Sequence, residues 1–188
     1  MLALAGAAYA CACCADPGLW SQTRARLTAA ERAELDRIRW GGTAHTYVTQ
    51  RGLDGVRGIA PPSASYSVST ARSGRRLELV FRDAKRRSGA LSFLLPRTAV
   101  LFSVDPGAGR RSSGGGPLLY KEWRFEGPVT GTGVFASGMA GRPRFHLILH
   151  GRGNRCVAAA DFRRFTLQVS GPRARYSLYG SLARPDPA

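Results

Sequence analysis

The chain has 188 residues, of which 28 are Lys or Arg and 12 are Asp or Glu, so its formal net charge is +16. The basic residues comprise 26 Arg and only two Lys. An apolar fraction of 44% is too high for a disordered chain of such charge. No apolar run reaches the roughly 18–20 residues that a membrane-spanning helix needs. These numbers exclude a disordered chain and a protein that crosses a membrane with helices. They leave room for one domain with a sizeable core.

The first ten residues, MLALAGAAYA, form a short apolar run that ends in an A-x-A pattern, Ala8-Tyr9-Ala10. This pattern predicts a signal-peptide segment over 1–10 and a periplasmic or secreted protein. The basic region that normally precedes such a run is missing. Two alternatives stay open: a lipoprotein acylated at Cys11, and an ordinary buried amino-terminal segment.

Four cysteines follow this pattern. Cleavage after Ala10 would place Cys11, Cys13 and Cys14 at the start of the mature protein, and the fourth is Cys156. In an exported chain they suggest up to two disulfides, with Cys156 joined to one of the other three. The alternative is a soft-metal site for copper or zinc, because thiolates suit both ions. The spacing is not the C-x-x-C of standard zinc sites.

The segment CACCADPG, with Trp20 soon after it, resembles the mature start of a group of small exported bacterial proteins of unknown function. The resemblance covers a short stretch and implies export, with no activity attached to it.

One helix is expected after this segment. Thr28 is a good N-cap, and Glu31 three residues later completes a capping box. Leu35 and Ile38 share one face, so a helix of about three turns should cover a sheet. Trp40-Gly41-Gly42 is expected to end it. The sequence thus divides into a Cys-rich entry segment with the helix over 11–42, one β domain over 43–183 and a disordered tail over 184–188.

From residue 43 the apolar pattern has the period of two that is typical of strands, with turn residues between the runs. A flexible loop is expected at Gly107–Gly116. Many short strands after one helix favour an all-β antiparallel fold, either an up-and-down barrel of lipocalin-like architecture or a β-sandwich. The barrel is preferred because tight turns join most runs; the G-x-W of lipocalins is absent. The expected strands are Ala44–Gln50, Val56–Ile59, Tyr66–Ala71, Arg75–Asp83, Gly89–Leu95, Val100–Val104, Leu118–Glu126, Thr130–Ser137, Arg144–Gly151, Arg163–Ser170 and Ala174–Leu182.

The charge is concentrated in two segments, 51–111 and 142–184, which carry +8 each. Within the second, Arg163, Arg164, Arg173 and Arg175 alternate with aromatic residues and are candidates for a basic binding surface. Such a pattern can bind nucleic acid, but the expected export disfavours that partner. An anionic envelope component is the better candidate, and a solvated surface with no partner is the plainest alternative.

His146 and His150 lie four apart in one expected strand, on the face opposite to Phe145 and Leu147. A rise of about 3.3 Å per residue separates them by about 13 Å, so as metal ligands they are weak candidates. Tyr120, Glu122, Arg124 and Glu126 share another strand face and suggest a cross-strand salt-bridge ladder.

No nucleophile elbow, zinc-protease helix or dinucleotide-binding turn occurs in the sequence. The sequence therefore predicts an exported, non-enzymatic β-barrel that binds a small apolar ligand in its interior or an anionic envelope partner. The alternatives are a copper- or zinc-handling protein and an enzyme of unrecognised type. Cofactor and oligomeric state are not predicted.

Overall fold

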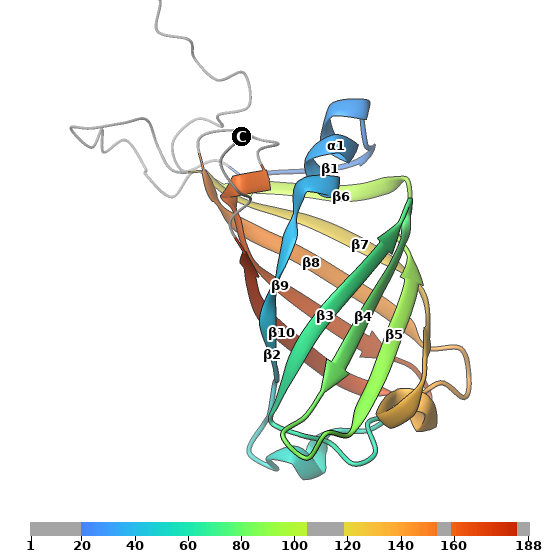
Figure 1. Cartoon of the computed structure of the whole chain (residues 1–188). Helices are drawn as coiled ribbons and strands as arrows, with labels where there is room; N and C mark the ends of the chain where they lie inside the picture. Colours follow the sequence, from blue (N-terminus) through green and yellow to red (C-terminus); the bar gives the residue numbers. More distant parts are fainter. Residues whose placement is uncertain (1–19, 105–118, 154–158, 184–188) are drawn as a thin grey trace, which may run out of the picture.

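The structure, a computed structural model, describes residues 20–104, 119–153 and 159–183. They form a closed antiparallel barrel of eight strands, with two further strands and one helix at one end (Figure 1). The ten strands are β1 (Trp20–Arg26), β2 (Arg39–Thr46), β3 (Ser65–Ser73), β4 (Arg76–Arg82), β5 (Ser88–Leu94), β6 (Thr98–Val104), β7 (Leu119–Gly131), β8 (Arg144–Gly153), β9 (Phe162–Ser170) and β10 (Arg175–Ala183). The helical elements are α1 (Ala29–Arg37) and three 3₁₀ helices, η1 (Leu53–Gly55), η2 (Gly133–Gly138) and η3 (Ala159–Asp161).

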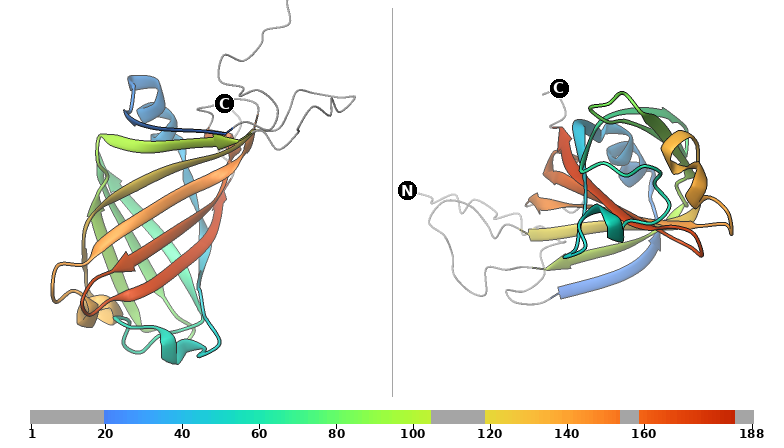
Figure 2. Two further views of the ribbon diagram at one scale, coloured as in Figure 1. Left: turned by 180° about the vertical axis from the view of Figure 1, so that it is seen from behind. Right: turned by 90° about the horizontal axis from the view of Figure 1, so that it is seen from below.

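The strands follow one another around the barrel in the order β2, β3, β4, β5, β7, β8, β9 and β10, and β10 pairs with β2 to close the ring. All neighbouring pairs are antiparallel. The predicted up-and-down barrel is therefore confirmed, and the sandwich alternative is not what forms. The view along the barrel shows the ring, with β1 and β6 layered outside it (Figure 2).

The long strand β7 changes partners along its length. Its first half pairs with β6 up to Arg124, and its end pairs with β5 from Val129 onward. Pro128 lies between these two ladders. Val129 donates its N–H to the carbonyl of Pro143 on the β8 side, so the missing N–H of Pro128 would have pointed to the opposite side, where the partner changes. A proline is tolerated there because no ladder bond is lost. The expected break between the strands Leu118–Glu126 and Thr130–Ser137 is wrong for this reason, because β7 continues through it.

The helix α1 has the capping box that the sequence predicts. The Glu31 N–H donates to Thr28 Oγ1 at 3.2 Å, and the Thr28 N–H donates to the Glu31 carboxylate at 2.6 Å. Leu35 is buried, and Arg72 of β3 donates to its carbonyl at 2.9 Å. The helix thus covers the end of the barrel where β1 and β6 lie (Figure 1). It ends at Arg37, earlier than expected, and Trp40 and the two glycines after it belong to β2.

Two expected strands are wrong. Val56–Ile59 follows a 3₁₀ helix and makes only one isolated bridge, at Arg57, because Gly58 at φ 93° breaks the extended backbone. The expected strand Thr130–Ser137 ends at Gly131 and is followed by η2. There Gly133 at φ 58° lets the chain turn against β5. Conversely β1 was not expected, because Trp20–Arg26 is exposed along nearly its whole length and lacks an apolar alternation.

Candidate functional site

The interior of the barrel is filled by aromatic and aliphatic side chains. Phe93 and Phe145 stack with ring centroids 4.4 Å apart, and Phe81 meets Phe135 edge-on at 5.3 Å. All four are buried. Eight strands leave an interior that side chains can just fill, and here they fill it with rings. These inward side chains pack against one another as core.

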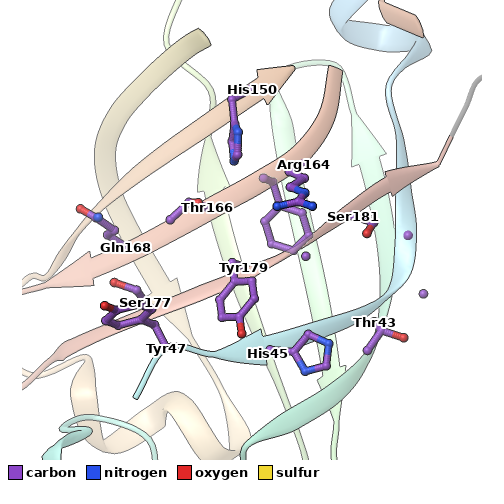
Figure 3. A pocket seen from close by; sticks show the side chains of 14 residues that line it. Thr43, His45, Tyr47, His150, Arg164, Thr166, Gln168, Ser177, Tyr179 and Ser181 are labelled. Carbon is purple, nitrogen blue, oxygen red and sulfur yellow. The ribbon is translucent and has the colours of Figure 1, made fainter. Parts of the chain in front are cut away.

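A hollow of about 770 Å³ lies on the outer face of the barrel, across β2, β10, β9 and β8 (Figure 3). We call it the outer groove. Outward side chains of these four strands line it, and most are polar. They are Thr43, His45 and Tyr47 from β2 and the residue after it, Ser177, Tyr179 and Ser181 from β10, Arg164, Thr166 and Gln168 from β9, and His150 from β8.

The register of the ladders sets which of these side chains are neighbours. One row runs across the wall through Ile148, Thr166, Tyr179 and His45, each opposite the next. The ring centroids of Tyr179 and His45, the last two residues of the row, lie 5.6 Å apart. Residues directly opposite each other have Cβ atoms about 5 Å apart. This row therefore places a hydroxyl, a phenol and an imidazole side by side at the centre of the outer groove.

A second row crosses the same wall toward the α1 end. Ser181 is opposite Arg164, Arg164 is opposite His150, and His150 is opposite Glu122 of β7. A bulge in the β8–β9 ladder falls at this point, between His150 and Gly151. A bulge adds a residue to one strand and re-aims its side chains. As a result the consecutive residues Arg163 and Arg164 are both exposed, although strand alternation would bury one of them.

Glycines shape the end of the outer groove near this row. A Cβ on Gly41 would lie 2.6 Å from the carbonyl oxygen of Ser181, and one on Gly180 would lie 2.4 Å from that of Thr43. Both distances are shorter than real Cβ contacts. Only glycine lets β2 and β10 approach each other so closely here, at the irregularity in their ladder. Backbone rather than side chains thus forms this part of the groove.

The lining of the outer groove is polar and holds hydroxyl groups beside one arginine and two imidazoles. These are Arg164, His45 and His150, and the lining contains no carboxylate. No acidic side chain of the described ranges forms a salt bridge with Arg164. Burial lowers the pKa of His150, the Arg164 charge lowers it further, and Glu122 partly opposes both. His150 is therefore neutral at pH 7 and can gain a proton when an anion binds beside it.

The outward face of β7 carries similar groups in a different arrangement. Glu122 accepts hydrogen bonds from Tyr120 at 2.5 Å and from Arg124 Nε at 2.6 Å. Burial and the bond to Glu122 raise the pKa of Tyr120 to about 12. The expected cross-strand ladder is thus mainly a cluster within one strand; the cross-strand pair, Glu126 with His146, is 3.9 Å apart. Tyr120, Glu122 and Arg124 thus satisfy one another.

The structure brings together only some of the residues singled out from the sequence. Arg164 and His150 line the outer groove, and Arg175 lines a neighbouring hollow. Arg163 and Arg173 are exposed but line neither hollow. His146 shares the outward face of β8 with His150, as expected. Across residues 20–104, 119–153 and 159–183, no group of three or more His, Cys, Asp or Glu could hold a metal ion. Cys11, Cys13, Cys14 and Cys156 lie outside the described residues.

Sequence reasoning missed Tyr179 and Tyr47, and nothing in the spacing selected His45. The alternation of Ser177, Tyr179 and Ser181 with buried residues shows that they face outward. It does not show that β10 lies beside β2, which the closure of the barrel decides.

No family model, curated protein or solved structure matches this chain. Within the part of the chain that the structure describes, no helix combines the length and apolar character that crossing a membrane requires.

Proposed function

We propose that this protein is a non-enzymatic binding protein that acts outside the cytoplasm and holds an anionic ligand in the outer groove. One observation carries the proposal. The groove gathers Arg164, two imidazoles and several hydroxyl groups around one hollow, with no carboxylate in its lining. Arginine binds carboxylate and phosphate oxygens through paired, charge-assisted hydrogen bonds. The lining therefore complements a negatively charged ligand of the kind found in bacterial envelopes.

The groove also has the construction expected of a binding site. A few polar groups converge on one hollow, and the filled barrel beneath holds them rigidly. Tyr179 and Tyr47 are 43% and 64% exposed. Exposed rings offer a ligand apolar contact next to the charged group, because a tyrosine has an apolar face and a polar end.

Titration of the purified protein with sodium sulfate, followed by two-dimensional NMR, tests this proposal. Sulfate should shift the amide signals of Arg164, His150 and Tyr179 in one saturable transition. Arg164→Gln should weaken binding about tenfold, since a charge-assisted hydrogen bond contributes about 1.5–3 kcal/mol. Arg82→Gln is the matched control, because Arg82 is an exposed outward residue of β4 outside the groove lining. Equal losses in both variants would show that only diffuse surface charge attracts the anion.

The proposed location rests on the signal-like segment 1–10 and needs its own test. Intact-mass analysis of protein produced in a bacterium with a periplasm should find the chain in the periplasm or medium, beginning at Cys11. The same measurement, repeated after reduction and thiol labelling, gives the state of the four cysteines. Cytoplasmic protein that retains residues 1–10 would contradict export.

A further inference from the structure

The outer groove continues into a second hollow, and this continuity indicates the form of the ligand. The second hollow, about 380 Å³, lies beside the first and is lined by Arg175 of β10 and by the segment around η1. We call it the Arg175 hollow. Tyr47, Gln168 and Ser177 line both hollows. The two hollows therefore adjoin each other on the outer wall of the barrel, with Tyr47 and Ser177 where they meet, and we call the pair the channel.

The channel has an arginine toward each end. Arg164 lies opposite Ser181, and Arg175 lies six residues before Ser181 on the same strand, β10. At a rise of about 3.4 Å per residue, the backbone positions that carry the two arginines are about 20 Å apart along the strand. A single sulfate, phosphate or small carboxylic acid bound at Arg164 does not fill the channel as far as Arg175. A ligand that uses the whole channel must be a chain with negative groups spaced along it.

Neutral polar groups line the stretch between the two arginines. Thr166, Gln168, Ser177 and Tyr179 supply hydroxyl and amide groups, so hydrogen-bonding groups outnumber cations along the channel. A nucleic acid strand carries a phosphate on every residue, and proteins meet it with closely spaced Lys and Arg. The channel instead fits a chain with many hydroxyl groups and few charges. Tyr47 and Tyr179 can each pack against the flat C–H face of a sugar ring.

Resting on the proposed function, we infer that the ligand is a linear acidic polysaccharide, a chain of sugars in which some residues carry a carboxylate. Its carboxylates pair with Arg164 and Arg175, and its hydroxyl groups bond to the polar lining between them. A hollow channel suits a flexible polymer better than the broad surface of a lipid bilayer. Binding at both ends of one chain should add an intramolecular gain in affinity, because the second contact forms at high effective concentration.

Calorimetric titration with galacturonate and with a linear hexamer in which galacturonate alternates with a neutral sugar tests this inference. The hexamer should bind at least tenfold more tightly than the monomer. Arg164→Gln should weaken both ligands. Arg175→Gln should weaken the hexamer and leave the monomer within twofold, because the monomer needs only the outer groove.

A carboxylate introduced at the middle of the channel gives the sharpest variant. Ser177→Asp should remove most of the length-dependent gain by repelling the polymer. Ser69→Asp is its matched control, because Ser69 is an exposed outward serine of β3 outside both hollows. Far-UV circular dichroism and thermal unfolding confirm that both variants fold. If Ser177→Asp folds and binds the hexamer as the wild type does, the channel is not the polymer site.

Several outcomes separate this inference from the proposed function. Sulfate binding at Arg164 with a hexamer no tighter than galacturonate would overturn the polymer inference and leave the anion-binding function standing. A failure of sulfate, galacturonate and hexamer alike would overturn both. Tighter binding of single-stranded DNA, or of vesicles of phosphatidylglycerol, than of the hexamer would overturn the inference in favour of that partner class.

Discussion

The outer wall of the barrel has two regions built from similar side chains, and they differ in whether those side chains have partners. On β7, Glu122 accepts hydrogen bonds from Tyr120 and Arg124, so charge and phenol are satisfied within the protein. In the outer groove, Arg164 lies among a phenol, imidazoles and hydroxyl groups, and the groove lining has no carboxylate. The comparison shows that basic and aromatic composition alone does not mark a site. The lack of a carboxylate in its lining is what distinguishes the outer groove from the β7 cluster.

The largest effect on the free energy of unfolding is expected from breaking a buried ion pair of β7, where a charge does have an internal partner. Lys121 of β7 is 2% exposed, bonds to the Asp161 carboxylate at 2.9 Å and lies over the Phe162 ring. Asp161→Ala removes the carboxylate from a buried ammonium, so the free energy of unfolding should fall by about 3 kcal/mol. Urea unfolding measures this. The double variant Lys121→Met with Asp161→Leu should recover part of the loss. A change below about 0.5 kcal/mol would mean that the pair is not a stabilising contact.

A second variant would convert the outer groove into a copy of the β7 cluster. Glu122 and Arg124 are two residues apart on one strand face, and Thr166 stands two residues from Arg164 on the outward face of β9. Thr166→Glu should supply Arg164 with an internal partner and weaken sulfate binding at least tenfold. Stability should change by less than about 0.5 kcal/mol, as is usual for surface substitutions. Ser69→Glu on β3 is the matched control. Undiminished sulfate binding by Thr166→Glu would contradict the role given to the missing carboxylate.

The smallest expected effect is a pH dependence. Burial holds the pKa of His150 below its usual value of about 6.5, with Arg164 lowering it and Glu122 raising it. A bound anion favours the imidazolium, so sulfate affinity should rise several-fold as pH falls below 6.5 toward that lowered pKa. Without ligand the sign is opposite. The stability that neutral His150 contributes is present above pH 6.5 and is lost as pH falls through its folded pKa.

Two variants separate this response from general charge effects. His150→Gln should remove its share of the rise in sulfate affinity. Glu122→Gln deletes the charge that opposes the shift, so the pKa of His150 should move further down. An NMR titration of the His150 ring measures this directly. A His150 pKa above 6.5 in the wild type would contradict the packing described for this residue.

Short-range features of the fold could be predicted from the sequence. The capping box of Thr28 and Glu31 depends on residues three apart, so its pattern was sufficient to locate the start of α1. The alternation of Leu77, Leu79 and Phe81 likewise identified β4, because burial repeats every second residue in a strand. The same reasoning placed β8 and β9 almost to their ends.

Features that depend on distant partners could not be predicted. A proline such as Pro128 favours a turn in the sequence. Only the change of neighbouring strand along β7, from β6 to β5, explains why it lies within a strand. The strand β1 has no periodic pattern of its own and forms because β6 offers it a complete ladder. For the site, the sequence identified Arg164 and Arg175 as basic-surface candidates, but the bulge that exposes Arg163 beside Arg164 follows from the β8–β9 register.

The sequence by itself determined the class of fold, the start of the helix and which side chains of the regularly alternating strands, such as β4 and β8, face outward, because these depend on residues within a few positions of one another. Tertiary structure alone decided that β10 closes against β2, which brings Tyr179 beside His45. It also decided that Glu122 lies one strand beyond the outer groove. Closure selects one register among many possible ones. That register separates the arginine with a carboxylate partner on β7 from Arg164 in the groove, whose lining has none.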